Sequence, residues 1–194
     1  MEKSKVLKGL RIAVMIADGF EASEFEVPYE TLRNAGAQVD VLVMDTDQLQ
    51  SGVQGMKHLM QEIRVRGDRL LRDADPKTYQ GLLIPGGALS VDQMRESPQH
   101  LAFIQNFMDA EKPVAAICHA GWLLADAGVL RGRTMTSWPS IRKDLERAGA
   151  IWKDQEVIVD RNLITSRKPA DLQAFCRELT SLLIQSFGSH SQVA

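Results

Sequence analysis

The sequence is poor in cysteine, in net charge and in long apolar segments, and each shortage excludes a class of protein. Only two of the 194 residues are cysteines, and the formal net charge is −2. So small a charge supplies no basic field for nucleic acid and no polybasic patch for a membrane surface. No apolar run approaches the length needed to cross a bilayer. We therefore expect neither nucleic-acid binding nor membrane binding.

The two cysteines, Cys118 and Cys176, are expected to be free thiols. Cys176 falls on the apolar side of a predicted amphipathic helix, where it fits as a core residue rather than as a disulfide partner. Free thiols are typical of a reducing compartment, so a cytoplasmic location is predicted. The His, Cys and carboxylate residues show no metal-site spacing, and Gly86-Gly87 is too short for a phosphate loop. No metal or cofactor is expected.

Strand-like and helix-like segments alternate along the chain. Apolar runs rich in β-branched residues predict buried parallel strands, and the segments between them predict helices. The strands are expected at residues 10–17, 38–44, 81–85, 113–117, 134–137, 156–160 and 163–166, and the helices at 21–35, 97–111 and 169–188. The last two strands form a predicted hairpin across Arg161-Asn162, because Asn tolerates positive φ. Residues 45–75 are less regular and predict a small excursion or short hairpin.

This alternation predicts an α/β fold, specifically a three-layer α/β/α sandwich around a mostly parallel, doubly wound, flavodoxin-like sheet. A length of 194 residues suits one domain, residues 1–194. The polar ends, residues 1–8 and 189–194, are expected to be flexible.

Cys118 stands at the most informative point of the sequence. Four apolar residues, 114–117, lead into it, and His119 follows at once, before a helix-like run. This order predicts a strand, a sharp turn and a helix start, with small residues at Ala116 and Ala120 because the turn crowds the backbone. A thiol at a helix N-terminus is favoured as thiolate. The alternative is a cysteine buried as a small hydrophobe.

The predicted fold brings Cys118 close to other polar residues. In doubly wound sheets, ligands bind at the carboxyl ends of the strands. Four polar segments fall at such ends, namely residues 18–24, 86–87, 118–119 and 165–167. Their convergence favours a reactive cysteine over a buried one.

Several motifs together resemble the ThiJ/PfpI superfamily, and most closely its PfpI branch of intracellular protease I proteins. They are residues 84–87 (IPGG), 116–119 (AICH), 130–133 (LRGR), 136–139 (TSWP) and 159–171, which ends in TSRKPAD. The likeness runs from about residue 10 to 183 and implies a domain similar to class I glutamine amidotransferases. One departure is Ala120-Gly121, which stands where the family usually has Gly-Pro.

The resemblance implies roles for individual residues. Cys118 would be the nucleophile of a nucleophile elbow, His119 its partner, and Glu24 a glutamate that hydrogen-bonds the sulfur. Asp92 would be an acid that reaches a histidine of a neighbouring subunit. The backbone amides of Gly87 and His119 would form an oxyanion hole, and the pocket would be walled by Gly86, Arg167 and Pro169.

Each role has a simpler alternative from the residues alone. Glu24 could be an acid that merely complements a helix dipole, and Asp92 could be a helix cap. His119 is not expected to reach the sulfur of its own neighbour in an extended turn. A carboxyl beside a thiolate is repelled unless protonated, so Glu24 should have a raised pKa. The other histidines, at positions 58, 100 and 190, are expected on the surface.

Two functions follow as hypotheses. The first is a cysteine-dependent stress-protection enzyme acting on carbonyl carbons, either a protease-type hydrolase on peptides or a glyoxalase or deglycase on methylglyoxal-type substrates. The second is a non-enzymatic oxidative-stress sensor or chaperone that uses oxidation of Cys118. The resemblance also implies self-association, with a C2 homodimer as the minimum and a hexamer as a larger option.

Overall fold

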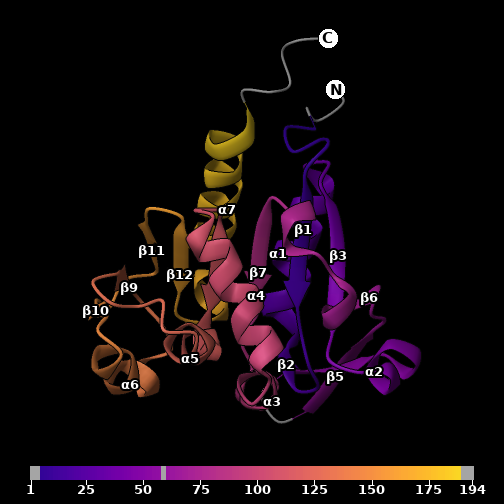
Figure 1. Cartoon of the computed structure of the whole chain (residues 1–194), viewed down its shortest axis with the longest axis horizontal. Coiled ribbons are helices and arrows are strands. Elements are labelled where there is room, and N and C mark those ends of the chain that lie inside the picture. Colours follow the sequence, from indigo (N-terminus) through magenta and orange to yellow (C-terminus); the bar gives the residue numbers. More distant parts are fainter. Residues whose placement is uncertain (1–4, 58–59, 189–194) are drawn as a thin grey trace.

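A seven-stranded sheet runs through the middle of the molecule (Figure 1). The computed structural model describes residues 5–57 and 60–188. The strands of the sheet are β1 (Arg11–Met15), β3 (Gln38–Val43), β6 (Arg69–Leu70), β7 (Gly81–Ile84), β8 (Val114–Ile117), β11 (Val157–Asp160) and β12 (Leu163–Ser166). Their spatial order is β11-β12-β8-β7-β1-β3-β6. All neighbours are parallel except β11, which runs antiparallel to β12.

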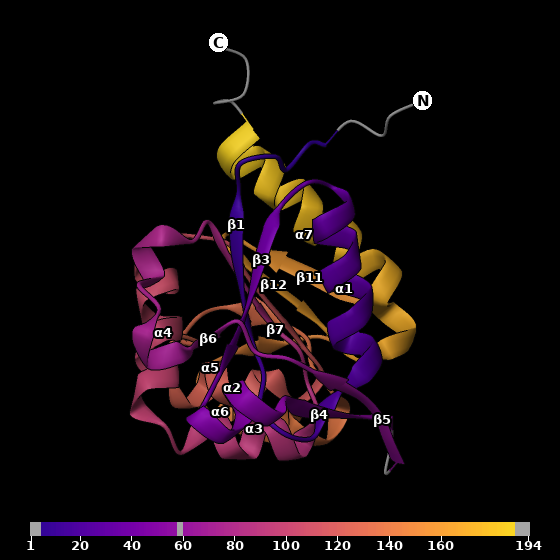
Figure 2. The same ribbon diagram turned by 90° about the vertical axis from the view of Figure 1, so that its right-hand side faces the viewer.

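Helices cover both faces of this sheet (Figure 2). α1 (Ala22–Asn34) and α7 (Leu172–Phe187) pack on one face, and α3 (Ala88–Arg95), α4 (Pro98–Asp109) and α5 (Gly121–Asp126) on the other. α6 (Arg142–Arg147) packs beside α5. Two separate apolar cores result, one on each face. The predicted doubly wound α/β/α sandwich is therefore confirmed.

Two smaller sheets complete the structure. β2 (Phe20–Glu21), β4 (Val53–Lys57) and β5 (Met60–Val65) form one, and β9 (Thr134–Met135) and β10 (Ile151–Trp152) form the other. The β4–β5 pair confirms the hairpin expected within residues 45–75, which also holds α2 (Thr46–Ser51). α3 carries no clear sign in the sequence and was not predicted, because it begins after Gly87 without a side-chain cap to mark its start.

The β11–β12 turn forms as predicted, but the positive φ lies at Arg161 (56°) instead of Asn162. The Asn162 side chain is buried and fully engaged. Its amide donates to the Lys112 carbonyl at 2.9 Å and its oxygen accepts from Arg133 at 3.0 Å. These hydrogen bonds fix the Asn162 side chain inside the fold, and the left-handed backbone conformation occurs at Arg161.

The chain ends and the surface follow the expectations in part. Residues 1–4 and 189–194 of the expected flexible ends lie outside the described residues, but Leu7 is fully buried and its N–H donates to the Ala35 carbonyl.

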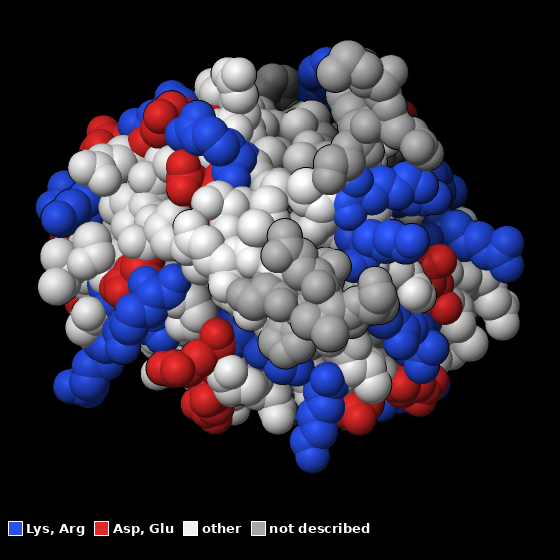
Figure 3. All heavy atoms as spheres, turned by 90° about the horizontal axis from the view of Figure 1, so that it is seen from above, with Lys and Arg blue, Asp and Glu red and all other residues white. Residues whose placement is uncertain are grey.

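Basic and acidic side chains both occur around the rim of the face in Figure 3, in keeping with the small net charge. Within the described ranges, no helix is long and apolar enough to cross a membrane.

His100 is buried on α4, and the expectation of a surface position is wrong. It is 2% exposed, and neither ring nitrogen has a hydrogen-bond partner among the described residues. Burial lowers its pKa to about 4, so the imidazole is neutral inside the fold. The sequence signal was ambiguous because His100 stands among apolar and polar residues alike. His58 and His190 lie outside the described residues.

Replacing this histidine should make the protein more resistant to acid. With a pKa near 6.5 in the unfolded chain and about 4 in the fold, the unfolded state binds more protons between these values, so stability falls as pH drops through that window. The loss amounts to about 3 kcal/mol at pH 4. The free energy of unfolding, measured in urea at about pH 7 and pH 4, should therefore differ less between the two pH values in His100→Phe than in the parent protein. An unchanged difference between the two pH values would contradict the assignment.

Candidate functional site

Cys118 lies where β8 ends and the chain turns sharply. Its φ is 61°, in the left-handed region that side chains other than glycine rarely adopt. Residues Cys118–Ala120 form a single 3₁₀ turn that leads directly into α5. The small residues on either side of Cys118, Ala116 and Ala120, are both buried. Strand, strained residue and helix together make the nucleophile-elbow geometry.

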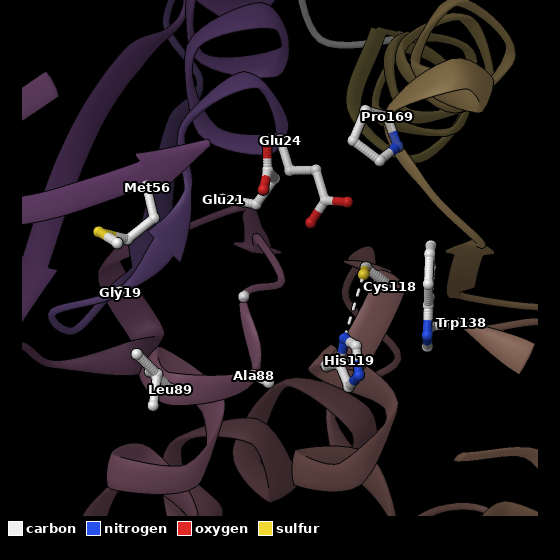
Figure 4. Close-up of a pocket in the computed structure, with 11 residues that line it drawn as sticks. Gly19, Glu21, Glu24, Met56, Ala88, Leu89, Cys118, His119, Trp138 and Pro169 are labelled. Atoms are coloured by element: carbon white, nitrogen blue, oxygen red, sulfur yellow. Dashed lines mark hydrogen bonds between the residues drawn. The ribbon is translucent and has the colours of Figure 1, made fainter. Parts of the chain in front are cut away.

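His119 turns its ring back to the thiol of its own neighbour. The Nδ1 atom lies 3.2 Å from Cys118 Sγ (Figure 4). The expectation that this contact is out of reach was wrong, because the turn is a tight 3₁₀ turn rather than an extended one. Burial lowers the pKa of His119, so the ring is neutral and can accept a proton through Nδ1.

Glu24 approaches the same sulfur from the first turn of α1. It is completely buried, and its Oε2 accepts a 2.9 Å hydrogen bond from the Gly86 N–H. Its other oxygen, Oε1, has no partner among the described residues, and Figure 4 shows the carboxyl directed towards Cys118. Burial, together with the charge of Glu21, raises the pKa of Glu24 to about 8. The raised pKa expected for this residue is confirmed, and the carboxyl is protonated near neutral pH.

The Gly86-Gly87 turn gives these groups their space. A Cβ at Gly86 would lie 2.5 Å from Glu24 Oε2 and 2.6 Å from Cys118 Cβ. Gly87 has a φ of 97°, and a Cβ there would collide with the backbone of Gly19 and Phe20. Both positions therefore require glycine.

The thiol form of Cys118 is favoured, which corrects the expectation of a thiolate. Burial raises the pKa of Cys118, and a charged Glu24 would raise it further. The backbone N–H groups of His119 and Gly87 act in the opposite direction. They do not prevail, because Cys118 is only 7% exposed and the helix after it is short. The thiol therefore needs a base, and His119 is in position to serve as one.

A pocket of about 250 Å³ opens above the sulfur. Its lining is mainly apolar, and Figure 4 shows how the side chains surround it. The residues are Gly19, Glu21, Glu24, Met56, Gly87, Ala88, Leu89, Cys118, His119, Trp138 and Pro169. Met56, Leu89 and Trp138 were not expected in the pocket. Only Trp138 carried a signal, since it belongs to one of the motifs.

The remaining candidates lie away from the sulfur, with one exception. Pro169 lines the pocket, as expected, but Arg167 does not, because its guanidinium pairs with Asp171 at 2.8 Å and with Asp154 at 2.6 Å. Asp92 is exposed on α3, outside the pocket lining. Its expected role across a subunit contact stays a prediction. No group of three or more potential metal ligands occurs in residues 5–57 and 60–188.

Comparison with known proteins identifies relatives of the whole chain. The model of the DJ-1/PfpI family matches residues 10–182. "Protein/nucleic acid deglycase 2" of Escherichia coli is 40% identical over 89% of this chain and 97% of that protein. "Putative cysteine protease YraA" of Bacillus subtilis is 39% identical over 89% of this chain and 98% of that protein. "General stress protein 18" of the same organism is 40% identical, over 90% and 98% respectively.

Solved structures agree with the fold. A two-domain protein from Anabaena variabilis, with DJ-1/ThiJ/PfpI-like and ferritin-like domains, is 31% identical with a TM-score of 0.83. The match covers 95% of this chain and 52% of that one. Drosophila melanogaster DJ-1beta is 27% identical with a TM-score of 0.79, and the match covers 95% and 98%.

The buried proton of Glu24 should be visible in the pH dependence of stability. Between pH 4.5, its ordinary pKa, and about 8, its pKa in the fold, the unfolded chain releases this proton and the folded chain keeps it. Stability therefore falls as pH rises through that window, by roughly 4 kcal/mol at its upper end. Glu24→Gln preserves the shape of the side chain but has no proton to lose. Its free energy of unfolding, measured in urea at about pH 5 and pH 8, should therefore lack this fall. The same pH dependence of the free energy of unfolding in variant and parent would show that Glu24 is charged in the fold.

Proposed function

Because the chain belongs to the DJ-1/PfpI family, we propose that it is a cysteine-dependent enzyme that acts on carbonyl carbons of small dicarbonyls of the methylglyoxal type. The observation that carries the proposal is a thiol with a neutral imidazole at 3.2 Å and a buried, protonated carboxyl beside it. Relatives named as a cysteine protease and as a deglycase support chemistry at a carbonyl carbon.

The size and lining of the pocket favour a small substrate. Its volume of about 250 Å³ lies below the range of roughly 300–1,000 Å³ typical of drug-sized ligands. A peptide substrate would need an extended groove on either side of the sulfur to hold the residues that flank the cleaved bond. A two- or three-carbon dicarbonyl fits above Cys118 without one.

The proposed reaction begins with proton transfer from Cys118 to His119 Nδ1. The sulfur adds to the aldehyde carbon, the C=O π electrons move to oxygen, and His119 returns the proton to give a hemithioacetal. The N–H groups of Gly87 and His119, which act on the sulfur, would steady the oxyanion. His119 then carries the C–H proton of the first carbon to the second oxygen, which gives an enediol, and the O–H proton of the first carbon moves to the second carbon. The first carbon is thereby oxidised to a thioester and the second is reduced to an alcohol. Water releases the resulting thioester as a hydroxy acid and restores the thiol.

Replacing the nucleophile should abolish this activity and leave the fold intact. Cys118→Ala is expected to lower kcat/KM for methylglyoxal by roughly a thousandfold or more, because no other group can form the covalent intermediate. Cys176→Ala is the matched control, since Cys176 lies on α7 outside the pocket lining, and it should retain full turnover. Peptide hydrolysis is measured on the same samples. Unchanged methylglyoxal turnover in Cys118→Ala would refute the covalent mechanism.

One observation also favours an oxidation-sensing role. The Oε1 atom of Glu24 is buried without a partner among the described residues, so a protonated Glu24 could donate to an oxygen of a sulfinate at Cys118. A relative named "General stress protein 18" agrees with a stress-related role.

Mild peroxide should then add two oxygens at Cys118 and none at Cys176. Peptide mapping by mass spectrometry is required, because Met60 is 74% exposed and gains oxygen readily. In Glu24→Leu, oxidation is expected to continue past the sulfinate, because leucine offers no hydrogen-bond donor to its oxygens. Absence of oxidation at Cys118 in the parent protein would rule out this second role.

Self-association belongs to the same proposal. Asp92 is exposed on α3 and could act only across a subunit contact, in a homodimer or a larger oligomer. Light scattering after size-exclusion chromatography gives the stoichiometry.

A further inference from the structure

The His119 ring lies against two indoles. The ring of Trp138 stacks on it at a centroid distance of 5.8 Å and an interplanar angle of 25°. Trp122 lies at 5.3 Å and is tilted by 56°. Figure 4 shows Trp138 beside His119 and Cys118 at the edge of the pocket. Among the described residues, no carboxylate forms a hydrogen bond or ion pair with His119, so aromatic faces take the place that an orienting acid often fills.

Trp138 is itself fixed by its backbone. Its N–H donates to the Cys118 carbonyl at 3.2 Å, which ties it to the turn that carries the nucleophile. Its own carbonyl accepts from the Ser137 hydroxyl at 3.0 Å, and that hydroxyl accepts from Trp152 Nε1 at 3.0 Å. These bonds fix the backbone from which the indole, which is 37% exposed, extends to form one wall of the pocket.

Trp122 is anchored independently of Trp138. Its Nε1 donates to Asp144 at 3.0 Å, and the Arg95 guanidinium lies 5.1 Å from its ring centroid. Because that cation already occupies its neighbourhood, Trp122 is less suited to stabilise a second positive charge. Trp138 makes the flatter stack on His119 and has no cation over its ring among the described residues.

We infer that Trp138 is a positioning residue, which holds His119 Nδ1 against the Cys118 thiol and stabilises the imidazolium that forms when the thiol proton moves to Nδ1. This inference rests on the proposed role of Cys118 as nucleophile. The transfer breaks the S–H bond, forms an N–H bond, and leaves a thiolate beside a cation that faces an indole π-system. Burial disfavours both charges, so the indole adds its attraction at the step where it is most needed.

The test is the rate at which iodoacetamide alkylates Cys118, followed by peptide mass spectrometry with Cys176 as internal reference. Trp138→Ala should slow alkylation at neutral pH by about tenfold, as expected for loss of a cation–π contact, and Trp138→Phe should restore most of the rate. Loss of the indole in Trp138→Ala also opens the pocket, which would speed the access of iodoacetamide to the sulfur. A second background is needed to separate this effect from the effect on His119.

His119→Phe supplies that background, since phenylalanine keeps the stacked ring and removes its nitrogens. Trp138→Ala should change the alkylation rate less than about twofold there, because Trp138 acts through the imidazole. An equal effect in both backgrounds, or no slowing in the first, overturns the inference. Alkylation requires no substrate, so failure of methylglyoxal turnover would refute the proposed function while this measurement still decides the role of Trp138.

Discussion

The site depends on the close approach of the Gly86-Gly87 turn to Glu24 and Cys118. Without a Cβ at position 86, the Gly86 N–H can bond the buried carboxyl at 2.9 Å while Cys118 packs against the same atoms. That contact fixes the carboxyl in an environment from which water is excluded, and the exclusion keeps it protonated. The chemistry of the sulfur therefore follows from a packing constraint on one glycine.

Burial has two opposite consequences at this site. It keeps Glu24 protonated as a potential donor to sulfur, but it also raises the pKa of Cys118 and lowers that of His119. The resting state is accordingly a neutral thiol beside a neutral imidazole, and charge separates only when a reaction requires it. A cysteine held in this way reacts once a neighbouring group takes its proton, since the thiolate is the reactive form.

Much of the fold could be predicted from hydrophobic patterning. The runs that became β1, β7 and β8 are almost continuously apolar because both faces of the sheet are covered. α3 could not be predicted in the same way, because its eight residues lack a capping side chain and a clear apolar period. His100 was misplaced because a histidine in a mixed helix carries no sign of burial, which only the packing of α4 decides.

The sequence by itself determined the α/β class, the sharp turn at Cys118 and the glycines beside it, because local pattern and family motifs specify backbone shape. Only the tertiary structure decided how the functional groups meet. The positive φ of Cys118 folds His119 back to 3.2 Å from the sulfur, and the 3₁₀ turn has no one-letter signature. Trp138 and Met56 enter the pocket from segments distant along the chain. Such contacts depend on long-range packing, which spacing in the sequence does not encode.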